Sequence, residues 1–184
     1  FYSDGATVFD VSHVAMPNGG GLSGNPAGNQ PVAIAQVPGS TTQFYVFTNS
    51  ANGTTGGVIS YSIVDISLPG SETFPTPPLG NVTATKNVPI AGLPNRSESM
   101  IIIPHTNQRD FWLITRENGA PNYSVTLFNN SVVGPVSTSN VTLGLIDVAG
   151  NFSWHEGSRR IAVSAQEANR DIEILNFNAT SGAL

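Results

Sequence analysis

The sequence predicts an all-β fold, and within that class a partial β-propeller. Short runs of strand-forming residues recur along the 184 residues, separated by clusters of Gly, Pro, Asn and Ser, whereas helix signals are nearly missing. The 13 prolines and 19 glycines punctuate the whole chain. Strand–turn–strand units also repeat, which is typical of propellers. A complete β-sandwich remains the alternative fold.

The repeats divide the chain into two complete units flanked by two partial ones. We expect a partial unit at 1–30, complete units at 31–92 and 98–142, and a partial unit at 150–184. A propeller blade takes about 40 to 50 residues, and a closed ring needs roughly four blades or more. The repeats therefore predict about half of a propeller ring. We interpret the chain as a fragment of a longer chain.

The strands of each unit follow in order. Within 1–30, the Asp4-Gly5 pair predicts a hairpin turn between two short strands. The remaining strands are expected at 31–37, 43–48, 58–65 and 83–90, then 100–105, 110–115, 123–128 and 134–141, and last 151–154, 160–164 and 171–177. The middle strands are apolar almost without alternation, which indicates burial on both faces.

The composition excludes several classes of function and favours a location. Seven basic residues against 12 acidic ones give a net charge of -5, with no basic cluster, so we expect no nucleic-acid partner. No apolar run reaches the roughly 20 residues of a transmembrane helix. The chain has no cysteine, which excludes disulfides and thiolate chemistry. A charged fraction of only 10% with abundant Ser, Thr, Asn and Gly favours an extracellular or cell-surface protein.

The first third of the chain carries a more specific pattern. Residues 1–10 read FYSDGATVFD, residues 13–19 read HVAMPNG, and residues 43–48 read QFYVFT. This pattern resembles the propeller-like N-terminal regions of large secreted, surface-exposed proteins of Bacteroidota, which are associated with type-nine secretion and gliding export. Further on, the run DFWLIT at 110–115 resembles a strand of the same family. The resemblance implies a location and an architecture, and it carries no catalytic residues over to this chain.

A search for catalytic and metal-binding patterns selects no residue. The three histidines, His13, His105 and His155, form no close-spaced pair that could bind a metal from one element. No Gly-x-Ser-x-Gly elbow is present, and turn chemistry explains acids such as Asp4. We therefore predict no catalytic residue, no metal site and no cofactor. A calcium ion held by scattered turn oxygens stays open, although no calcium-loop motif is present.

Two neighbouring residues are the candidates for binding. Trp154 ends a predicted strand and precedes a polar turn, so its ring is expected to be partly exposed, and His155 begins that turn. An exposed aromatic ring with polar neighbours is a platform for a sugar or a protein. The sequence thus predicts a binding site around Trp154 and His155.

Eight Asn-x-Ser/Thr sequons are candidates for N-glycosylation. The alternative explanation is that Asn, Ser and Thr are simply favoured in the turns of a loop-rich β protein. The sequons begin at Asn52, Asn81, Asn95, Asn122, Asn129, Asn140, Asn151 and Asn178.

These observations predict a non-enzymatic extracellular or cell-surface module that acts in binding or adhesion. Its partner would be a surface glycan, a matrix component or a protein, because rigid propellers present loops for recognition. Two alternatives remain. The chain could be an assembly protein that forms a fibre or sheath through exposed strand edges, or it could be part of a carbohydrate-active enzyme.

Overall fold

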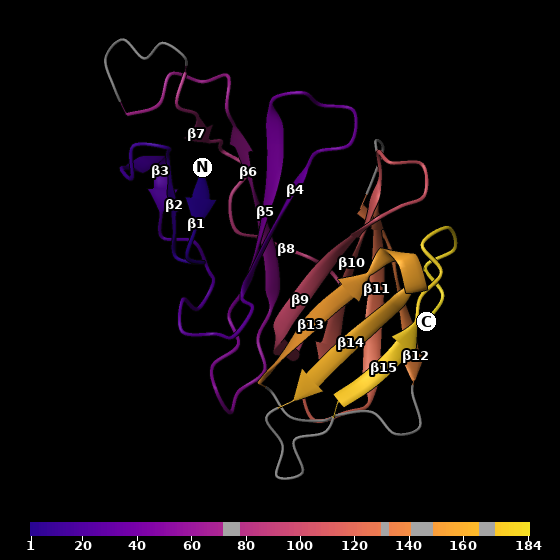
Figure 1. Cartoon of the computed structure of the whole chain (residues 1–184). Helices are drawn as coiled ribbons and strands as arrows, with labels where there is room; N and C mark the ends of the chain where they lie inside the picture. Colours follow the sequence, from indigo (N-terminus) through magenta and orange to yellow (C-terminus); the bar gives the residue numbers. More distant parts are fainter. Residues whose placement is uncertain (72–77, 130–132, 141–148, 166–171) are drawn as a thin grey trace.

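The computed structural model describes residues 1–71, 78–129, 133–140, 149–165 and 172–184, and these residues form four antiparallel β-sheets (Figure 1). Across these ranges there is no α-helix, and the helical element present is the short 3₁₀ turn η1, Glu156–Ser158. The all-β prediction is therefore confirmed. None of the four sheets closes on itself within the described residues.

The first sheet holds β1 (Tyr2–Ser3), β2 (Thr7–Phe9) and β3 (Ala15–Gly20). The turn between β1 and β2 lies at the predicted place. A carboxylate oxygen of Asp4 accepts the backbone N–H groups of Ala6 at 2.8 Å and Thr7 at 2.7 Å. Gly5 takes φ 98°, a conformation that residues with a side chain rarely adopt. The hairpin predicted from Asp4-Gly5 is confirmed.

The second sheet holds β4 (Val32–Gln36), β5 (Gln43–Asn49), β6 (Ile59–Asp65), β7 (Asn81–Val82) and β8 (Val88–Pro89). The fourth strand expected at 83–90 is split in two. Both β7 and β8 pair with β6, and Asn87 between them has φ 54°. A left-handed residue interrupts an extended strand, so two short segments share the place of one strand.

The third sheet holds β9 (Arg96–Pro104), β10 (Phe111–Glu117), β11 (Asn122–Phe128) and β12 (Val133–Asn140). β9 begins four residues before the strand expected at 100–105. Its added residues, 96–99, are polar and buried. Partners compensate for part of this burial: Asn49 donates to the Ser97 backbone carbonyl at 2.6 Å, and Arg96 donates to the Ser124 hydroxyl at 2.8 Å. The buried Ser97 hydroxyl has no hydrogen-bond partner among the described residues.

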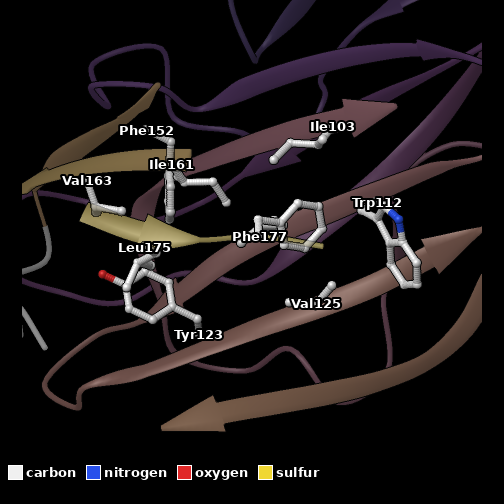
Figure 2. Close-up of a cluster of buried hydrophobic side chains, with 10 residues drawn as sticks. Ile103, Trp112, Tyr123, Val125, Phe152, Ile161, Val163, Leu175 and Phe177 are labelled. Atoms are coloured by element: carbon white, nitrogen blue, oxygen red, sulfur yellow. The ribbon is translucent and has the colours of Figure 1, made fainter. Parts of the chain in front are cut away.

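The fourth sheet holds β13 (Gly150–His155), β14 (Arg160–Ala165) and β15 (Ile172–Asn176). It lies across the third sheet, and the two are packed face to face (Figure 1). Figure 2 shows side chains that fill the space between them. Trp112 of β10 meets Phe177, which follows β15, edge to face, and Tyr123 of β11 meets Phe152 of β13 in the same way.

Each pair of neighbouring sheets shares one hydrophobic cluster. Val8 and Val46 belong to the cluster between the first and second sheets, and Phe47 and Leu113 to the cluster between the second and third. β10 is buried over Phe111–Arg116 and contributes to two clusters, with Leu113 on one face and Ile114 on the other. The predicted two-sided burial of this middle strand is confirmed, and it fixes the third sheet as the centre of the core.

Candidate binding site

Three turns meet at one end of the third and fourth sheets. The first turn, 105–110, joins β9 to β10, and the second, 155–159, joins β13 to β14. The third is the C-terminal turn 178–183, which follows β15 and is closed by a bridge between Asn178 and Ala183. Because the two hairpins belong to sheets that pack on each other, residues far apart in sequence come together here.

The ring of His105 holds the first turn. Its Nδ1 lies 3.1 Å from the backbone N of Asn107 and accepts that N–H. Its Nε2 lies 3.1 Å from the carbonyl oxygen of Thr180, and a carbonyl can only accept. His105 is therefore protonated on Nε2, and both ring nitrogens are used to join the first turn to the C-terminal turn.

The second turn is held by His155 in a similar way. The Nδ1 atom of His155 accepts the backbone N–H of Ser158 at 3.1 Å and lies 3.0 Å from the Ser158 hydroxyl. This contact caps the 3₁₀ turn, which ends at Arg159 with φ 53° and ψ 44°. The His155 ring thus shapes the turn that presents Glu156 and Arg159.

The C-terminal turn is docked on Trp112. The indole Nε1 of Trp112 donates to the carbonyl of Ala179 at 2.8 Å. Gly182 has φ 74°, and a Cβ at this position would lie 2.6 Å from the Trp112 ring. Only glycine fits this backbone at that distance, so Gly182 lets the turn close against the indole.

The three turns enclose a pocket of about 430 Å³, which we call the Trp154 pocket. This volume falls in the range of roughly 300 to 1,000 Å³ found for small-ligand sites. Trp154 is half-buried, and its ring packs edge-on against Phe177 with 5.8 Å between centroids. The polar residues that line the pocket are His105, Thr106, Gln108, Glu156 and Arg159.

The lining combines an apolar ring with separate hydrogen-bonding groups. Gln108 and Glu156 offer acceptors, and Arg159 offers five fixed donors. All three are exposed, so their polar groups remain available to a ligand. An aromatic face with polar groups around it can bind a molecule that has both C–H faces and hydroxyls.

Two residues of the lining have an unfavourable backbone conformation. Gln108 has φ 57° and Arg159 has φ 53°, in the left-handed region that favours Gly, Asn or Asp. Each occupies the turn of a different hairpin, yet both lie on the same pocket. Backbone strain of this kind concentrates at functional sites. Long polar side chains at two such positions favour a role for them in the pocket.

Asp110 fixes the base of the first turn. Its carboxylate accepts from the Asn107 side chain at 2.8 Å and from Arg109 Nε at 3.1 Å. Burial alone raises the pKa of the Asp110 carboxyl, but the hydrogen bonds from Asn107 and Arg109 and the charge of Arg109 outweigh burial and leave that pKa below its ordinary value. Asp110 therefore stabilises the turn as a carboxylate.

Of the two residues predicted for binding, one lines the pocket and the other does not. Trp154 lies in the pocket, as expected from its position before a polar turn. His155 is exposed, but its ring is directed to Ser158 and it is not among the lining residues; its role in binding stays a prediction. Sequence reasoning missed Gln108 and Arg159. Both residues lie in the turn between two strands of a repeat. This equivalence is the sequence signal that could have indicated that their two turns lie close together.

The sequon asparagines differ in how their side chains are held where the structure describes them. Asn81 accepts the N–H of Gly70, Asn95 donates to the carbonyl of Asn118, Asn122 donates to Glu117, and Asn178 accepts the N–H groups of Thr180 and Ser181. The exposed sequon asparagines are Asn52, Asn95, Asn151 and Asn178. Asn129 is half-buried, and the Asn140 side chain lies outside the described residues. N-glycosylation itself stays a prediction.

Among the described residues, no group of three or more His, Asp or Glu side chains is placed to hold a metal ion. A calcium site stays open as a prediction. In the same part of the chain, no helix has the length and apolar character needed to cross a membrane.

No family model, no curated protein and no solved structure matches the chain. The resemblance to surface proteins of Bacteroidota therefore remains an interpretation of the sequence.

Proposed function

We propose that the chain is a non-enzymatic, extracellular or cell-surface β-propeller module that acts in binding or adhesion, with a glycan as the partner of the Trp154 pocket. The observation that carries this proposal is the pocket itself, in which the half-buried Trp154 lies beside exposed polar side chains from two hairpin turns. Sugar rings present an apolar C–H face and hydroxyl groups, and this lining is complementary to both.

The arrangement of sheets supports the propeller part of the proposal. Strands follow one another in each sheet in chain order, as β9 to β12 do, and successive sheets pack face to face through shared clusters. Propeller blades are sheets of about four meandering strands that pack face to face, so this arrangement supports the proposal.

The lining also supports binding rather than hydrolysis. Glycoside hydrolysis generally needs two carboxyl groups about 5 to 9 Å apart. Among the described residues that line the pocket, Glu156 is the carboxylate present. A single exposed carboxylate can accept a hydrogen bond from a sugar hydroxyl, and it lacks the second group that the reaction requires.

Binding to a panel of immobilised glycans tests the proposal, with matrix proteins on the same surface as a second class of partner. We expect Gln108→Ala and Arg159→Ala to weaken glycan binding several-fold. Arg160→Ala is the matched control, because Arg160 is exposed beside Arg159 but does not line the pocket. Binding to no glycan, or equal loss in the Arg159 and Arg160 variants, would contradict the proposal. Binding to matrix protein alone would replace the glycan with a protein partner.

A further inference from the structure

Two of the three histidines of the chain hold turns that line the Trp154 pocket. His105 begins the turn 105–110, which joins β9 to β10, and His155 begins the turn 155–159, which joins β13 to β14. In each turn the Nδ1 atom of the ring accepts a backbone N–H from its own turn. Two sides of one pocket are therefore shaped by the same kind of contact.

The contact made by His105 requires a neutral ring. Its Nδ1 accepts the Asn107 N–H at 3.1 Å, and a nitrogen that accepts must carry a free electron pair. Protonation places a hydrogen on Nδ1, so an N–H of the ring then faces an N–H of the backbone. Since Nε2 keeps its hydrogen, the bond to the Thr180 carbonyl is not lost in this step. The change begins in the first turn, which carries Gln108 to the pocket.

The contact made by His155 depends on the same protonation state. Its Nδ1 accepts the Ser158 N–H at 3.1 Å and lies 3.0 Å from the Ser158 hydroxyl. The hydroxyl can rotate and accept a hydrogen bond from a protonated ring, whereas the backbone N–H can only donate. Protonation thus removes the cap of the 3₁₀ turn, which ends at Arg159 with φ 53°. A strained conformation of this kind persists only where surrounding contacts hold it.

The groups around His105 favour opening of the first turn when the ring is charged. The Asp110 carboxylate lies at the end of this turn, close enough for its charge and that of His105 to interact. A protonated ring competes with Asn107 and Arg109 for that carboxylate, and this competition loosens the turn. The Trp112 ring, 5.8 Å away between centroids, also attracts a charged imidazole. The charged groups that face the ring from the second turn are Glu156 and Arg159.

The groups around His155 act in the same direction. Arg160 lies opposite His155 in the β13–β14 pair, and like charges across an antiparallel pair repel each other. Glu156 and Arg159, its charged neighbours within the turn, have opposite signs. The C-terminal turn 178–183 carries no charged side chain. The charged groups that face the ring from the first turn are Arg109 and Asp110, which are paired with each other.

We propose that His105 and His155 form a pH-sensitive switch, which keeps the Trp154 pocket in its observed shape at neutral pH and releases both turns in mild acid. Histidine is the side chain whose charge ordinarily changes between about pH 5 and pH 8. Protonation favours the open form of each turn, so a falling pH shifts the population toward that form. Gln108 and Arg159 then leave their places in the pocket and a bound glycan is released. This last step rests on the proposed function.

Nuclear magnetic resonance of the nitrogen-15-labelled chain tests the switch without a ligand. At pH 7.5 we expect both rings in the tautomer that carries its hydrogen on Nε2. As the rings take up a proton between pH 7.5 and pH 5, the Asn107 and Ser158 amides should lose about tenfold in protection against solvent exchange, relative to the intrinsic rate at each pH. Undiminished protection of both amides once the rings are protonated would overturn the proposal.

Asparagine in place of each histidine removes the titration and keeps an acceptor. A side-chain oxygen of Asn bonds to backbone N–H groups in turns and at caps. In the double variant His105→Asn/His155→Asn we therefore expect the Asn107 and Ser158 amides to be equally protected at both pH values. A loss of protection in the double variant as large as in the parent chain would contradict a switch made of these two rings.

The third histidine provides the matched control. His13 is exposed and lies 3.1 Å from the Tyr2 hydroxyl through its Nδ1, beside the first sheet. Its φ of 64° is a conformation that asparagine accepts. His13→Asn should lose protection of the Asn107 and Ser158 amides to the same extent as the parent chain. Abolition of the pH response by His13→Asn would contradict the proposal.

Glycan binding at two pH values tests the consequence for the pocket. With a neutral glycan, whose own charge does not change, we expect about tenfold weaker binding to the parent chain at pH 5.5 than at pH 7.5. The double variant should show a ratio close to one, whatever its affinity. Equal binding by the parent chain at both pH values would overturn release by the switch. Absence of glycan binding at both would contradict the proposed function alone, because amide protection still decides whether the turns open.

Discussion

The side-chain amide of Gln30 pairs with the backbone of Phe152. Its Oε1 accepts the Phe152 N–H at 2.9 Å, and its Nε2 donates to the Phe152 carbonyl at 3.3 Å. These are the two bonds that a residue of a neighbouring strand would make with β13. The loop before β4 is thereby joined to the fourth sheet across 122 residues of sequence, which ties the end of the first unit to the last unit.

Removal of this amide should weaken the whole fold. We expect Gln30→Ala to lower the free energy of unfolding by about 1 to 3 kcal/mol, because the N–H and carbonyl of the buried Phe152 lose their partners. Gln36→Ala is the control, since the Gln36 side chain is exposed and bonds to Ser40 only four residues away. Urea unfolding measures both, and equal losses would contradict the role given to Gln30.

A buried carboxylate makes a second link between units. Glu98 on β9 is 4% exposed and accepts the N–H groups of Gly53 at 2.8 Å and Asn29 at 3.1 Å. In Glu98→Gln an amide NH₂ replaces one acceptor and faces a backbone donor. We expect a loss of about 2 kcal/mol in the free energy of unfolding. Glu156→Gln, at an exposed carboxylate, should change stability little, and a similar effect of both would argue against the link.

Two carboxylates should make stability depend on acid pH. Hydrogen bonds from Ser67 hold the pKa of Asp65 below its ordinary value of 3.8, and the Asp110 pKa is lowered too, where burial is outweighed by bonds from Asn107 and Arg109. As the pH falls, these two carboxylates are therefore protonated in the unfolded chain before they are protonated in the folded chain. Their contribution to the free energy of unfolding is complete above about pH 4 and is lost below it.

The Asn variants test this pH dependence. Asp65→Asn and Asp110→Asn should each lower stability at neutral pH and reduce its fall between about pH 5 and pH 2. Urea unfolding at a series of pH values measures the slope. Slopes in both variants as steep as in the parent chain would contradict the assignment.

Arg159 has a left-handed backbone conformation, so its replacement by glycine should change stability and ligand binding in opposite directions. Arg159→Gly should raise the free energy of unfolding by up to about 1 kcal/mol, because glycine adopts φ 53° without the steric cost paid by arginine. The same change should weaken binding at the pocket. Arg160→Gly, at the start of β14, should instead lower stability. Thermal unfolding of both variants measures this, and a less stable Arg159→Gly would contradict the strain argument.

Local signals predicted the parts of the fold that depend on neighbouring residues. Asp4-Gly5 indicated the first hairpin because its turn bonds are made within three residues. The start of β9 was missed, because the polar run from Arg96 is buried by partners such as Asn49 that lie far away in sequence. No local pattern announces a partner of that kind.

The candidate site, like the fold, was predictable only where a local sequence signal was present. Trp154 could be selected because a polar turn follows it. The polar residues around it, such as Gln108, could not be selected, because they reach the pocket through the packing of two sheets. His155 illustrates the converse, since its proximity to Trp154 in sequence leads to a cap on Ser158 rather than to the pocket wall.

The most direct test of the account is an NMR titration of the labelled chain with the glycan that binds best on the panel. The chain has two tryptophans, so two indole N–H signals are expected, and that of Trp112 is bonded to Ala179. We predict saturable shifts of the Trp154 indole and of the Gln108 and Arg159 amides, with smaller changes at Trp112. Shifts confined to residues outside the three turns, with the Trp154 signal unmoved, would contradict the Trp154 pocket as the binding site.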